Sequence, residues 1–434
     1  MHAFRALRIR PFALLWVGQT LSRIGDFVYE VVLAWWVLQE TGSAVVMGSV
    51  LIVTFLPVAL FTLVGGTVAD RFARVPVLLA SDIARGIAVL AVAMLAAADH
   101  LELWMVFALS LLFGVADAFF QPAYFALVPE IVPEEDLPSA NALGSMSFQL
   151  GRVAGPALGG IIVAAGGVVA GFVINGLSFF VGAALLLPLL AVSRPPERAA
   201  DGEPLGALAR MVADTREGLA TVRGDPVLAI GLIAGALSGA LLVGPFLVSM
   251  PFMAQARFGD DPRYLGFILA TFPVGFILGS LWGGRRTVLR RRGVLAYGGT
   301  AIAGLMLAVY GLPLMPASLE GVAARLGLPL APALAGTAVL LAVLAAAALV
   351  NGFGLEIAGL VWMHVLQTRV PDAQLGRVVS LGELLSWAST PASFAVAGWA
   401  TEAYGPNLPF LVGGCGAAAV ALLALAHPAI RGLD

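Results

Sequence analysis

A row of polar side chains crosses an otherwise apolar stretch near the start of the chain. Within residues 11–39, Gln19, Arg23, Asp26 and Glu30 follow one another at helical spacing, which puts them on one stripe of a helix. An acid held in lipid can bind a proton, a cation or a cationic substrate. We expect Arg23 to pair with Asp26 or Glu30, so that one acid titrates while the other stays paired. The alternative is a permanently charged cluster that only joins this helix to its neighbours.

Two further charges lie in apolar stretches. Asp117, in residues 101–128, shares a helical stripe with Gln121 and Tyr124. It either accepts a proton or an arginine partner, or makes one structural hydrogen bond to a neighbouring backbone. Arg152, in residues 138–166, is expected to point toward Asp26 or Asp117; a buried structural ion pair is the alternative.

The segment around Arg152 reads GRVAGPALGG, residues 151–160. Its glycines at positions 151, 155 and 159 form one helical stripe, while Arg152 and Pro156 share another, about 80° around the helix. Small residues on one stripe let a neighbouring backbone approach closely, and a proline can bend the helix. The segment therefore predicts two faces with different chemistry.

The elements that must position these residues are membrane-spanning helices. The chain has 434 residues, of which 60% are hydrophobic and only 12% charged. Apolar runs long enough to cross a bilayer recur from end to end, and the first of them is too long for a signal peptide. We expect spans at residues 11–39, 44–70, 76–98, 101–128, 138–166, 168–192, 226–256, 264–284, 294–315, 333–363, 375–402 and 407–428. The predicted fold is an all-α membrane protein with twelve transmembrane helices in two six-helix bundles.

The arginines predict the orientation. All 24 basic residues are arginine, and most of them lie at span ends that face the same side as the N-terminus. Arg257, Arg263 and Arg325 fall on the opposite side. Under the positive-inside rule this asymmetry places both termini in the cytoplasm, so we expect a multi-pass cytoplasmic membrane protein.

Other classes of protein find little support in the sequence. The single cysteine, Cys415, excludes an intrachain disulfide, and the four histidines show no ligand spacing. No zinc-protease, nucleophile-elbow or phosphate-loop motif is present, so we expect no enzyme, no cofactor and no metal. A net charge of −2 gives no case for nucleic acid.

A polar segment divides the chain near its middle. We expect an N-terminal bundle at 1–193, a cytoplasmic linker at 194–225 and a C-terminal bundle at 226–434. Within the linker, residues from Leu205 to Val222 have apolar positions at helical spacing, which indicates an amphipathic helix on the membrane surface or a plain helical connector. A weak sequence similarity between VPEEDLPSANALG (132–144) and VPDAQLGRVVSLG (370–382) indicates two related halves.

At two motifs the chain resembles the major facilitator superfamily. The segment GGTVADRFAR matches that superfamily's signature between spans two and three, although Ala73 and Val75 depart from it. The matching residues are Gly66, Asp70, Arg71 and Arg74. The segment GRVAGPALGG matches the antiporter motif of span five at every fixed position, namely Gly151, Gly155, Pro156, Gly159 and Gly160. Together with GVADAFFQPAYFALVPEIVP (114–133) and SANAL (139–143), the chain is similar to macrolide-efflux proteins and enterobactin-type exporters.

The resemblance implies roles for these residues. Span five would pack its glycine face on span eight, whose Gly279, Gly283 and Gly284 would supply the partner surface. The loop signature would form a cytoplasmic gate, with Asp70 near the start of span eleven and with Asp82 and Arg85 extending its charge network. Span four lacks the arginine that many drug/proton antiporters carry, so proton coupling does not transfer through that residue.

The sequence thus predicts a secondary active exporter that works by alternating access. Its partners would be protons, membrane lipid and an amphiphilic drug, macrolide or siderophore, and we expect a monomer. Met250 and Met253 suit a surface for a bulky ligand, or they pack in the core. A lipid or lysolipid flippase, a proton-independent uniporter or importer, and a membrane enzyme are the alternatives.

Overall fold

The computed structural model describes residues 2–191, 193, 215–286, 290–325 and 332–434. All regular secondary structure in these ranges is helical, as expected for a chain whose backbone must satisfy its own hydrogen bonds in lipid. The surroundings of Gly66 and of the Asp70 side chain lie outside the described part. So does most of the predicted linker, and the expected boundaries at residues 193 and 225 therefore stay a prediction.

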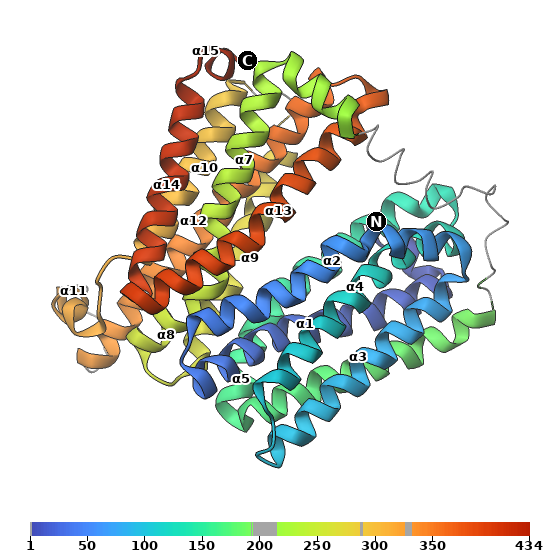
Figure 1. Cartoon of the computed structure of the whole chain (residues 1–434), viewed down its shortest axis with the longest axis horizontal. Helices are drawn as coiled ribbons and strands as arrows, with labels where there is room; N and C mark the ends of the chain where they lie inside the picture. Colours follow the sequence, from blue (N-terminus) through green and yellow to red (C-terminus); the bar gives the residue numbers. More distant parts are fainter. Residues whose placement is uncertain (1, 192, 194–214, 287–289, 326–331) are drawn as a thin grey trace. The chain divides into compact units, whose positions relative to one another are not determined.

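Long helices make up the first part of the chain (Figure 1). After a short 3-10 helix, η1 (His2–Arg8), they are α1 (Arg10–Thr41), α2 (Ala44–Arg71), α3 (Arg74–Ala97), α4 (Leu103–Ile131) and α5 (Leu137–Leu186), with η2 (Glu134–Asp136) and η3 (Leu187–Ala191) on either side of α5. Gly42 ends α1 in the left-handed conformation (φ 59°), which suits a glycine. These helices cover the first six predicted spans, because α5 contains two of them.

Helix α5 is broken at one residue. Gly167 has φ 71° and ψ −178°, a conformation that only glycine adopts without strain. The chain reverses there, and residues 137–166 and 168–186 form two separate crossings. A single glycine therefore replaces a loop between predicted spans five and six.

The second part of the chain also consists of helices. They are α7 (Pro226–Gly244), the π-helical η4 (Pro245–Ser249), α8 (Met250–Phe258), α9 (Pro262–Gly284), α10 (Arg292–Val309), η5 (Pro316–Leu319), α11 (Glu320–Arg325), α12 (Pro332–Arg369), α13 (Asp372–Tyr404), α14 (Asn407–Ala426) and α15 (Pro428–Arg431). Together, α7, η4 and α8 form one crossing with a π-helical segment, next to Pro245 and Pro251.

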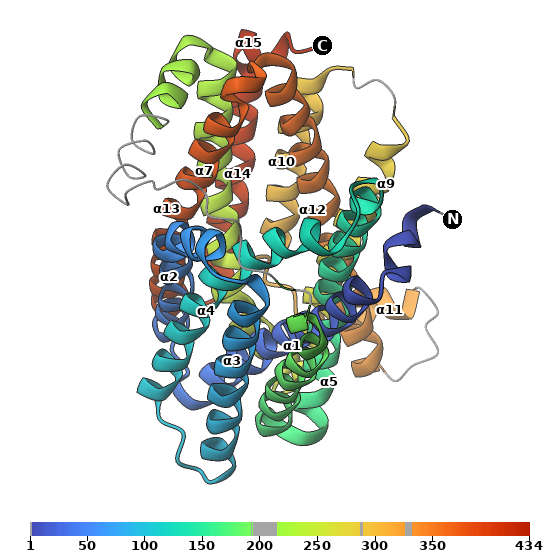
Figure 2. The ribbon, with the colours of Figure 1, turned by 90° about the vertical axis from the view of Figure 1, so that its right-hand side faces the viewer.

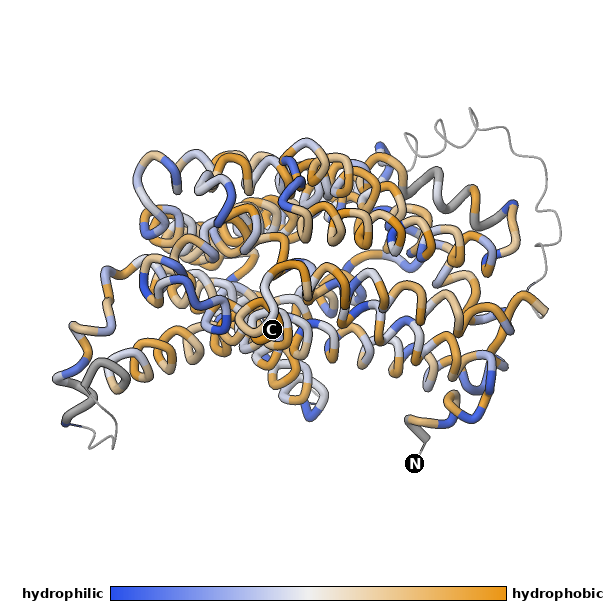
Figure 3. The backbone as a smooth tube through the Cα atoms, turned by 90° about the horizontal axis from the view of Figure 1, so that it is seen from below, coloured by the Kyte–Doolittle hydropathy of each residue, from blue (hydrophilic) through white to orange (hydrophobic). Residues whose placement is uncertain are grey.

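The number of crossings agrees with the prediction. Nine described segments are long and apolar enough to span a membrane, and one of them, Glu134–Ala191, contains the break in α5. Helices α1 (32 residues) and α13 (33 residues) are also long enough to cross a membrane but contain more polar residues. With these helices included and α5 counted twice, the described chain has the twelve crossings of the predicted fold class. Apolar residues dominate the helices in Figure 3, and hydrophilic residues gather at their ends.

Contacts divide the chain into two compact units. The first unit comprises Met1–Gly42, Ser49–Asp201 and Asp261–Ala270. In it α1 packs along both halves of α5, and α3 packs on α4 and α5. Its core contains Phe12, Leu78 and Leu127, all fully buried.

The second unit comprises Ser43–Gly48, Gly202–Asp260 and Thr271–Asp434. Helix α10 packs between α12 and α14, and these three run side by side in Figure 2. Helix α7 packs on α13 and α14. Arg257, at the end of α8, donates from Nη2 to the carbonyl of Tyr310, to the carbonyl of Leu312 (2.7 Å) and to Asn407 Oδ1 (3.2 Å).

Residues 215–224 of the predicted linker are helical. Val222 is buried with residues of α7, α12 and α13, and Leu219 packs on the same cluster. Thr221 Oγ1 donates to Gln374 Oε1 (2.9 Å), and Arg377 pairs with Glu217 (2.7 Å). The described end of the predicted amphipathic helix thus packs on protein, and its position at the membrane surface stays a prediction.

The first residues of α2 pack on the end of α13 within the second unit. Ser43 Oγ and the Val45 amide both donate to Glu402 Oε2, at 2.6 and 3.1 Å. A Cβ at Gly398 would lie 2.6 Å from the carbonyl oxygen of Ala44, and one at Gly48 would lie 2.6 Å from that of Phe394. Backbone contact and a carboxylate at a helix N-terminus therefore hold this junction together.

Candidate functional site

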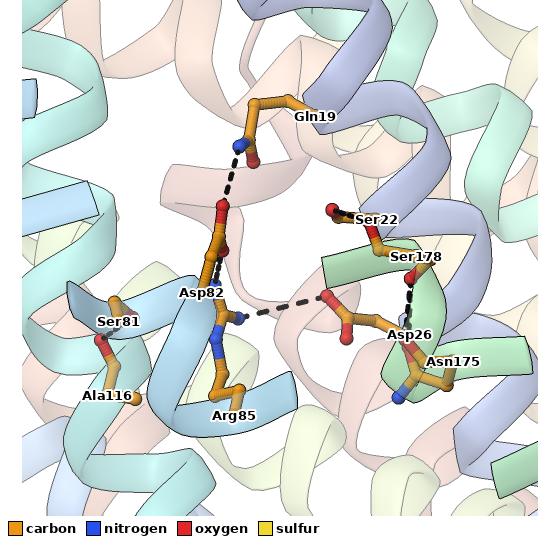
Figure 4. A network of polar contacts seen from close by, with 9 residues as sticks. All are labelled: Gln19, Ser22, Asp26, Ser81, Asp82, Arg85, Ala116, Asn175 and Ser178. Carbon is orange, nitrogen blue, oxygen red and sulfur yellow. Dashed lines mark hydrogen bonds and ion pairs between the residues drawn. The ribbon is translucent and has the colours of Figure 1, made fainter. Parts of the chain in front are cut away.

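A buried arginine stands at the centre of the polar residues of the first unit. Arg85 Nη2 donates to Asp82 Oδ1 at 2.7 Å, and Arg85 Nη1 lies 3.9 Å from Asp26 Oδ2. Gln19 Nε2 donates to Asp82 Oδ2 at 3.4 Å. We call Gln19, Asp26, Asp82 and Arg85 the Arg85 cluster; Figure 4 shows the Asp26 carboxylate pointing from α1 toward the guanidinium on α3.

The members of the Arg85 cluster differ in exposure. The side chains of Asp82 and Arg85 are 0% and 4% exposed, whereas that of Asp26 is 34% exposed. Asp26 is thus the more exposed acid of the cluster, and Asp82 is the one held at hydrogen-bond distance. Since Asp82 and Arg85 are three residues apart on α3, their pair depends on one helix, while the pair with Asp26 depends on the packing of α1 on α3.

Aromatic rings cover the guanidinium of Arg85. Its Cζ lies 4.7 Å from the ring centre of Phe120 on α4 and 4.5 Å from that of Phe179 on α5. Such cation–π contacts stabilise a desolvated cation and exclude water from it. Carboxylates and ring faces, rather than water, therefore compensate the charge of Arg85.

Small residues bring α1 close to the second half of α5. A Cβ at Gly18 would lie 3.3 Å from Gly182 Cα, and one at Gly25 would lie 2.6 Å from Asn175 Oδ1. A Cβ at Gly182 would lie 2.7 Å from Ser22 Oγ and 3.5 Å from Asp82 Oδ2. These glycines leave the space in which the Arg85 cluster lies.

Negative charge exceeds positive charge around Asp26. The carboxylates of Asp117, Asp82 and Glu30 lie near enough to repel Asp26, and Arg85 attracts it. Glu30 is exposed and interacts electrostatically with Arg152, whose guanidinium lies 5.7 Å from the ring centre of Phe148. The structure thus brings together four of the five predicted coupling residues, directly or through a neighbour.

Arg23 is the exception, and its predicted pairing is wrong. Its Nη1 donates to the carbonyl of Gly144 at 3.1 Å, and its guanidinium lies 5.0 Å from the ring centre of Tyr124. Arg23 thus reaches toward α4 and the start of α5, while Asp26 faces α3. The cation beside Asp26 is Arg85. The charge of Arg152 acts on Glu30, an acid that was not among its predicted partners, and its predicted direction stays a prediction.

Several buried polar atoms of this region have no hydrogen-bond partner in the described structure. They are Asp26 Oδ1, Asn175 Nδ2, Arg85 Nε, Tyr29 Oη and Ser110 Oγ. Buried polar groups in proteins are normally satisfied by protein or by ordered water.

The glycine face of the span-five motif packs on α1, which corrects the prediction that it packs on span eight. A Cβ at Gly151 would lie 2.9 Å from the Phe27 ring, one at Gly155 would lie 3.0 Å from the Phe27 backbone, and one at Gly159 would lie 3.1 Å from the Val28 carbonyl oxygen. The three residues face the same neighbour because they share one helical stripe.

The contact of α5 with α9 involves the next residue along the helix. A Cβ at Gly160 would lie 2.7 Å from the carbonyl oxygen of Pro262, and the Pro156 carbonyl lies against Gly266. The predicted partners Gly279 and Gly283 instead face α12, and a Cβ at Gly284 would have open space. The motif thus has two faces, as predicted. Its glycine stripe contacts α1, while Pro156 and Gly160 contact α9.

The loop signature is only partly described. Arg71 is exposed, and Arg74 pairs with Glu130 at 3.2 Å. The gate at Gly66 and Asp70 stays a prediction because the surroundings of these two residues lie outside the described part. Asp82 and Arg85 belong to the buried Arg85 cluster, and their predicted link to the signature stays a prediction.

The sequence did not reveal which helices meet at the Arg85 cluster. The spacing of Asp82 and Arg85 within an apolar span was the signal for a buried pair, but it does not reveal that α1 supplies the third member. Met250 and Met253 are fully buried, so their role is core packing.

Comparisons with known proteins agree with this architecture. The sequence model of the Major Facilitator Superfamily matches residues 15–329. The multidrug efflux pump Tap of Mycolicibacterium fortuitum is 27% identical over 433 residues, 98% of this chain and 97% of that protein. Macrolide efflux protein A of Streptococcus pyogenes is 23% identical over 69% of this chain and 73% of that protein. Enterobactin exporter EntS of Citrobacter koseri is 30% identical over 74% of this chain and 68% of that protein.

Solved structures resemble the fold. A bacterial homologue of the iron transporter ferroportin in an inward-facing state has a TM-score of 0.67 at 16% identity, covering 96% of this chain and 99% of that one. A mutant of the nucleoside transporter NupG has a TM-score of 0.69 at 13% identity, covering 96% of this chain and 99% of that one.

Proposed function

Because this chain belongs to the major facilitator superfamily, we propose that it exports amphiphilic small molecules in exchange for protons. Its named relatives are efflux transporters for several drugs, a macrolide and enterobactin, which supports export of a bulky organic compound. The chain is a multi-pass membrane protein. We place both termini in the cytoplasm, following the arginine asymmetry, and expect the monomer to be the transporting unit.

The observation that carries the proposal is the position of Asp26. It is the more exposed acid of the Arg85 cluster, 3.9 Å from Arg85, with the charges of Asp82, Asp117 and Glu30 near it. Excess negative charge in a desolvated interior favours the binding of a proton or of a cationic group. Asp26 is therefore the proposed exchange site, and Asp82 the fixed counter-charge.

The distances suggest how proton binding acts on the helices. A charged Asp26 attracts Arg85 and thereby draws α1 toward α3. A protonated Asp26 loses that attraction, and Arg85 keeps its 2.7 Å pair with Asp82. Proton binding thus changes the interaction between two helices without leaving Arg85 uncompensated, as alternating access requires.

The charges of Glu30, which is exposed, and Arg152, which is half-buried, interact electrostatically. We propose that they contact the polar part of the substrate, while Asp117 adds negative charge that favours cationic compounds. The flippase and uniporter alternatives remain outcomes of the experiment below.

The experiment measures drug-dependent proton movement in proteoliposomes that contain the purified chain. Wild type is compared with Asp26→Asn and with Glu40→Gln, an exposed acid at the end of α1 that serves as the control. We expect Asp26→Asn to lose proton movement and uphill export, while Glu40→Gln behaves as wild type.

Unchanged coupling in Asp26→Asn contradicts the assignment of the exchange site. Substrate movement without any proton dependence in wild type supports a uniporter. Translocation of labelled lysolipid that ignores the proton gradient supports a flippase.

A further inference from the structure

Five arginines lie within eight residues between α9 and α10. Arg285 and Arg286 follow the end of α9, and positions 290, 291 and 292 are also arginine. Residues 262–319 contain no aspartate or glutamate. The local sequence therefore supplies no counter-charge for this group, which we call the α9–α10 arginines.

Few of these arginines have partners in the described structure. Arg292 Nε donates to the Asp434 carbonyl at 2.5 Å, and the guanidinium of Arg286 lies 4.9 Å from the ring centre of Trp282. Arg285, Arg290 and Arg291 make no ion pair with any described residue. In the same unit Arg369 pairs with Asp225 (2.9 Å) and Arg377 pairs with Glu217 (2.7 Å). Among the described residues, carboxylates thus pair with these two arginines but not with Arg285, Arg290 or Arg291.

The backbone conformation at Arg291 is unusual for an arginine. Arg291 precedes α10 with φ 54°, in the left-handed region where asparagine or glycine is more stable. An arginine at this position accepts a local conformational cost. Its exposed guanidinium is the feature that glycine would lack.

The surrounding side chains give the depth of the group in the membrane. Leu278 and Leu281 of α9 and Val294 of α10 are 42%, 54% and 44% exposed, as expected for residues that face hydrocarbon. Trp282 is of the residue type enriched at the membrane interface. The α9–α10 arginines lie beyond these apolar residues and so at the level of the lipid headgroups.

We propose that the α9–α10 arginines bind the headgroup phosphate of anionic phospholipids. A cluster of four or more basic residues directly beside a membrane-spanning helix is suited to anionic lipid, because several guanidinium groups can contact phosphate oxygens. The apolar residues at the ends of α9 and α10 would contact the acyl chains of the same lipid. This proposal depends on the twelve-crossing fold and not on the direction or coupling of transport.

The experiment measures lipid binding to the purified full-length chain in detergent. Dioleoyl phosphatidylglycerol and dioleoyl phosphatidylcholine are titrated separately, and bound lipid is followed by native mass spectrometry and by thermal unfolding. The test variant combines Arg285→Gln, Arg286→Gln, Arg290→Gln and Arg291→Gln. The control removes the same charge from exposed arginines elsewhere, with Arg8→Gln, Arg216→Gln, Arg223→Gln and Arg431→Gln.

We expect wild type and control to prefer phosphatidylglycerol, and the test variant to lose that preference. Each single substitution should weaken phosphatidylglycerol binding about fivefold, since a basic residue near an anionic membrane contributes on the order of 1 kcal/mol. Equal binding of both lipids by wild type overturns the proposal, and so does an unchanged preference in the test variant. Stabilisation by inorganic phosphate alone that is lost in the test variant assigns the site to a soluble anion instead.

Discussion

Arg85 Nη1 lies 3.9 Å from Asp26 Oδ2, across the contact between α3 and α1. This distance permits an ion pair but not a hydrogen bond, so the interaction is electrostatic and sensitive to small movements of either helix. The same guanidinium holds Asp82 at 2.7 Å. Arg85 thus has a close partner in Asp82 and a more distant one in Asp26. If the charge of Asp26 changes, the pair of Arg85 with Asp82 can persist.

Removing Arg85 should destabilise the protein strongly. Arg85→Gln leaves Asp82 buried without a cation, a change that typically costs about 3–5 kcal/mol. The double variant Arg85→Gln/Asp82→Asn removes both charges and should recover most of that loss. Thermal unfolding measures stability, and drug-dependent proton movement measures coupling, which we expect the double variant to lack. A folded double variant with normal coupling would show that the cluster is only structural.

A side chain at Gly155 should force α1 away from α5. The added Cβ of Gly155→Ala would lie 3.0 Å from the Phe27 backbone and closer still to its Cβ, so we expect a loss of roughly 1–3 kcal/mol. Gly235→Ala on α7 is the control, because a Cβ there has open space. Thermal unfolding of both variants in detergent tests the difference. Equal stability would refute the close packing of the glycine face on α1.

Arg257 should stabilise the turn that follows α10, because it donates to the carbonyls of Tyr310 and Leu312. Arg257→Met leaves the carbonyls of Tyr310 and Leu312 and the side chain of Asn407 without this donor. Unsatisfied acceptors of this kind cost about 1–3 kcal/mol each when buried. We expect a lower unfolding temperature for Arg257→Met, and almost none of this loss for Arg263→Met, whose exposed side chain pairs with nearby Asp261. A wild-type unfolding temperature for Arg257→Met would exclude this role.

Glu402 should protect the first turn of α2. Glu402→Gln weakens the acceptor for Ser43 and for the Val45 amide and removes the negative charge from the helix N-terminus, worth about 1 kcal/mol. Hydrogen exchange at the Val45 amide should then accelerate about fivefold. Glu320→Gln, at the start of α11, provides the control and should leave this amide unchanged. Unaltered exchange in Glu402→Gln would mean that backbone packing alone holds the turn.

Hydropathy predicted the crossings because lipid contact requires long apolar segments almost regardless of tertiary structure. Periodicity likewise predicted that Asp26 faces the interior. It could not choose between Arg23 and Arg85 as its partner, because that choice depends on which helix packs against each side of α1. A pattern within one helix has no access to this information.

The glycine motif shows the same limit. The stripe of Gly151, Gly155 and Gly159 correctly indicated a face for close packing, but several helices could have occupied that face. The position of α1 follows from the sharp reversal at Gly167, which lays both halves of α5 along α1. The φ of 71° at that residue has no marker in the sequence beyond the pair Gly166–Gly167.

That reversal also bears on how the chain is inserted during synthesis. Two crossings joined by one glycine, with no charged residue in 153–193, form a helical hairpin whose halves can enter the bilayer together. No polar loop has to be translocated between them, so insertion of this pair does not involve moving charge across the membrane. The hairpin also limits the non-helical connection between its halves to one residue, which leaves little irregular chain for a protease to cut.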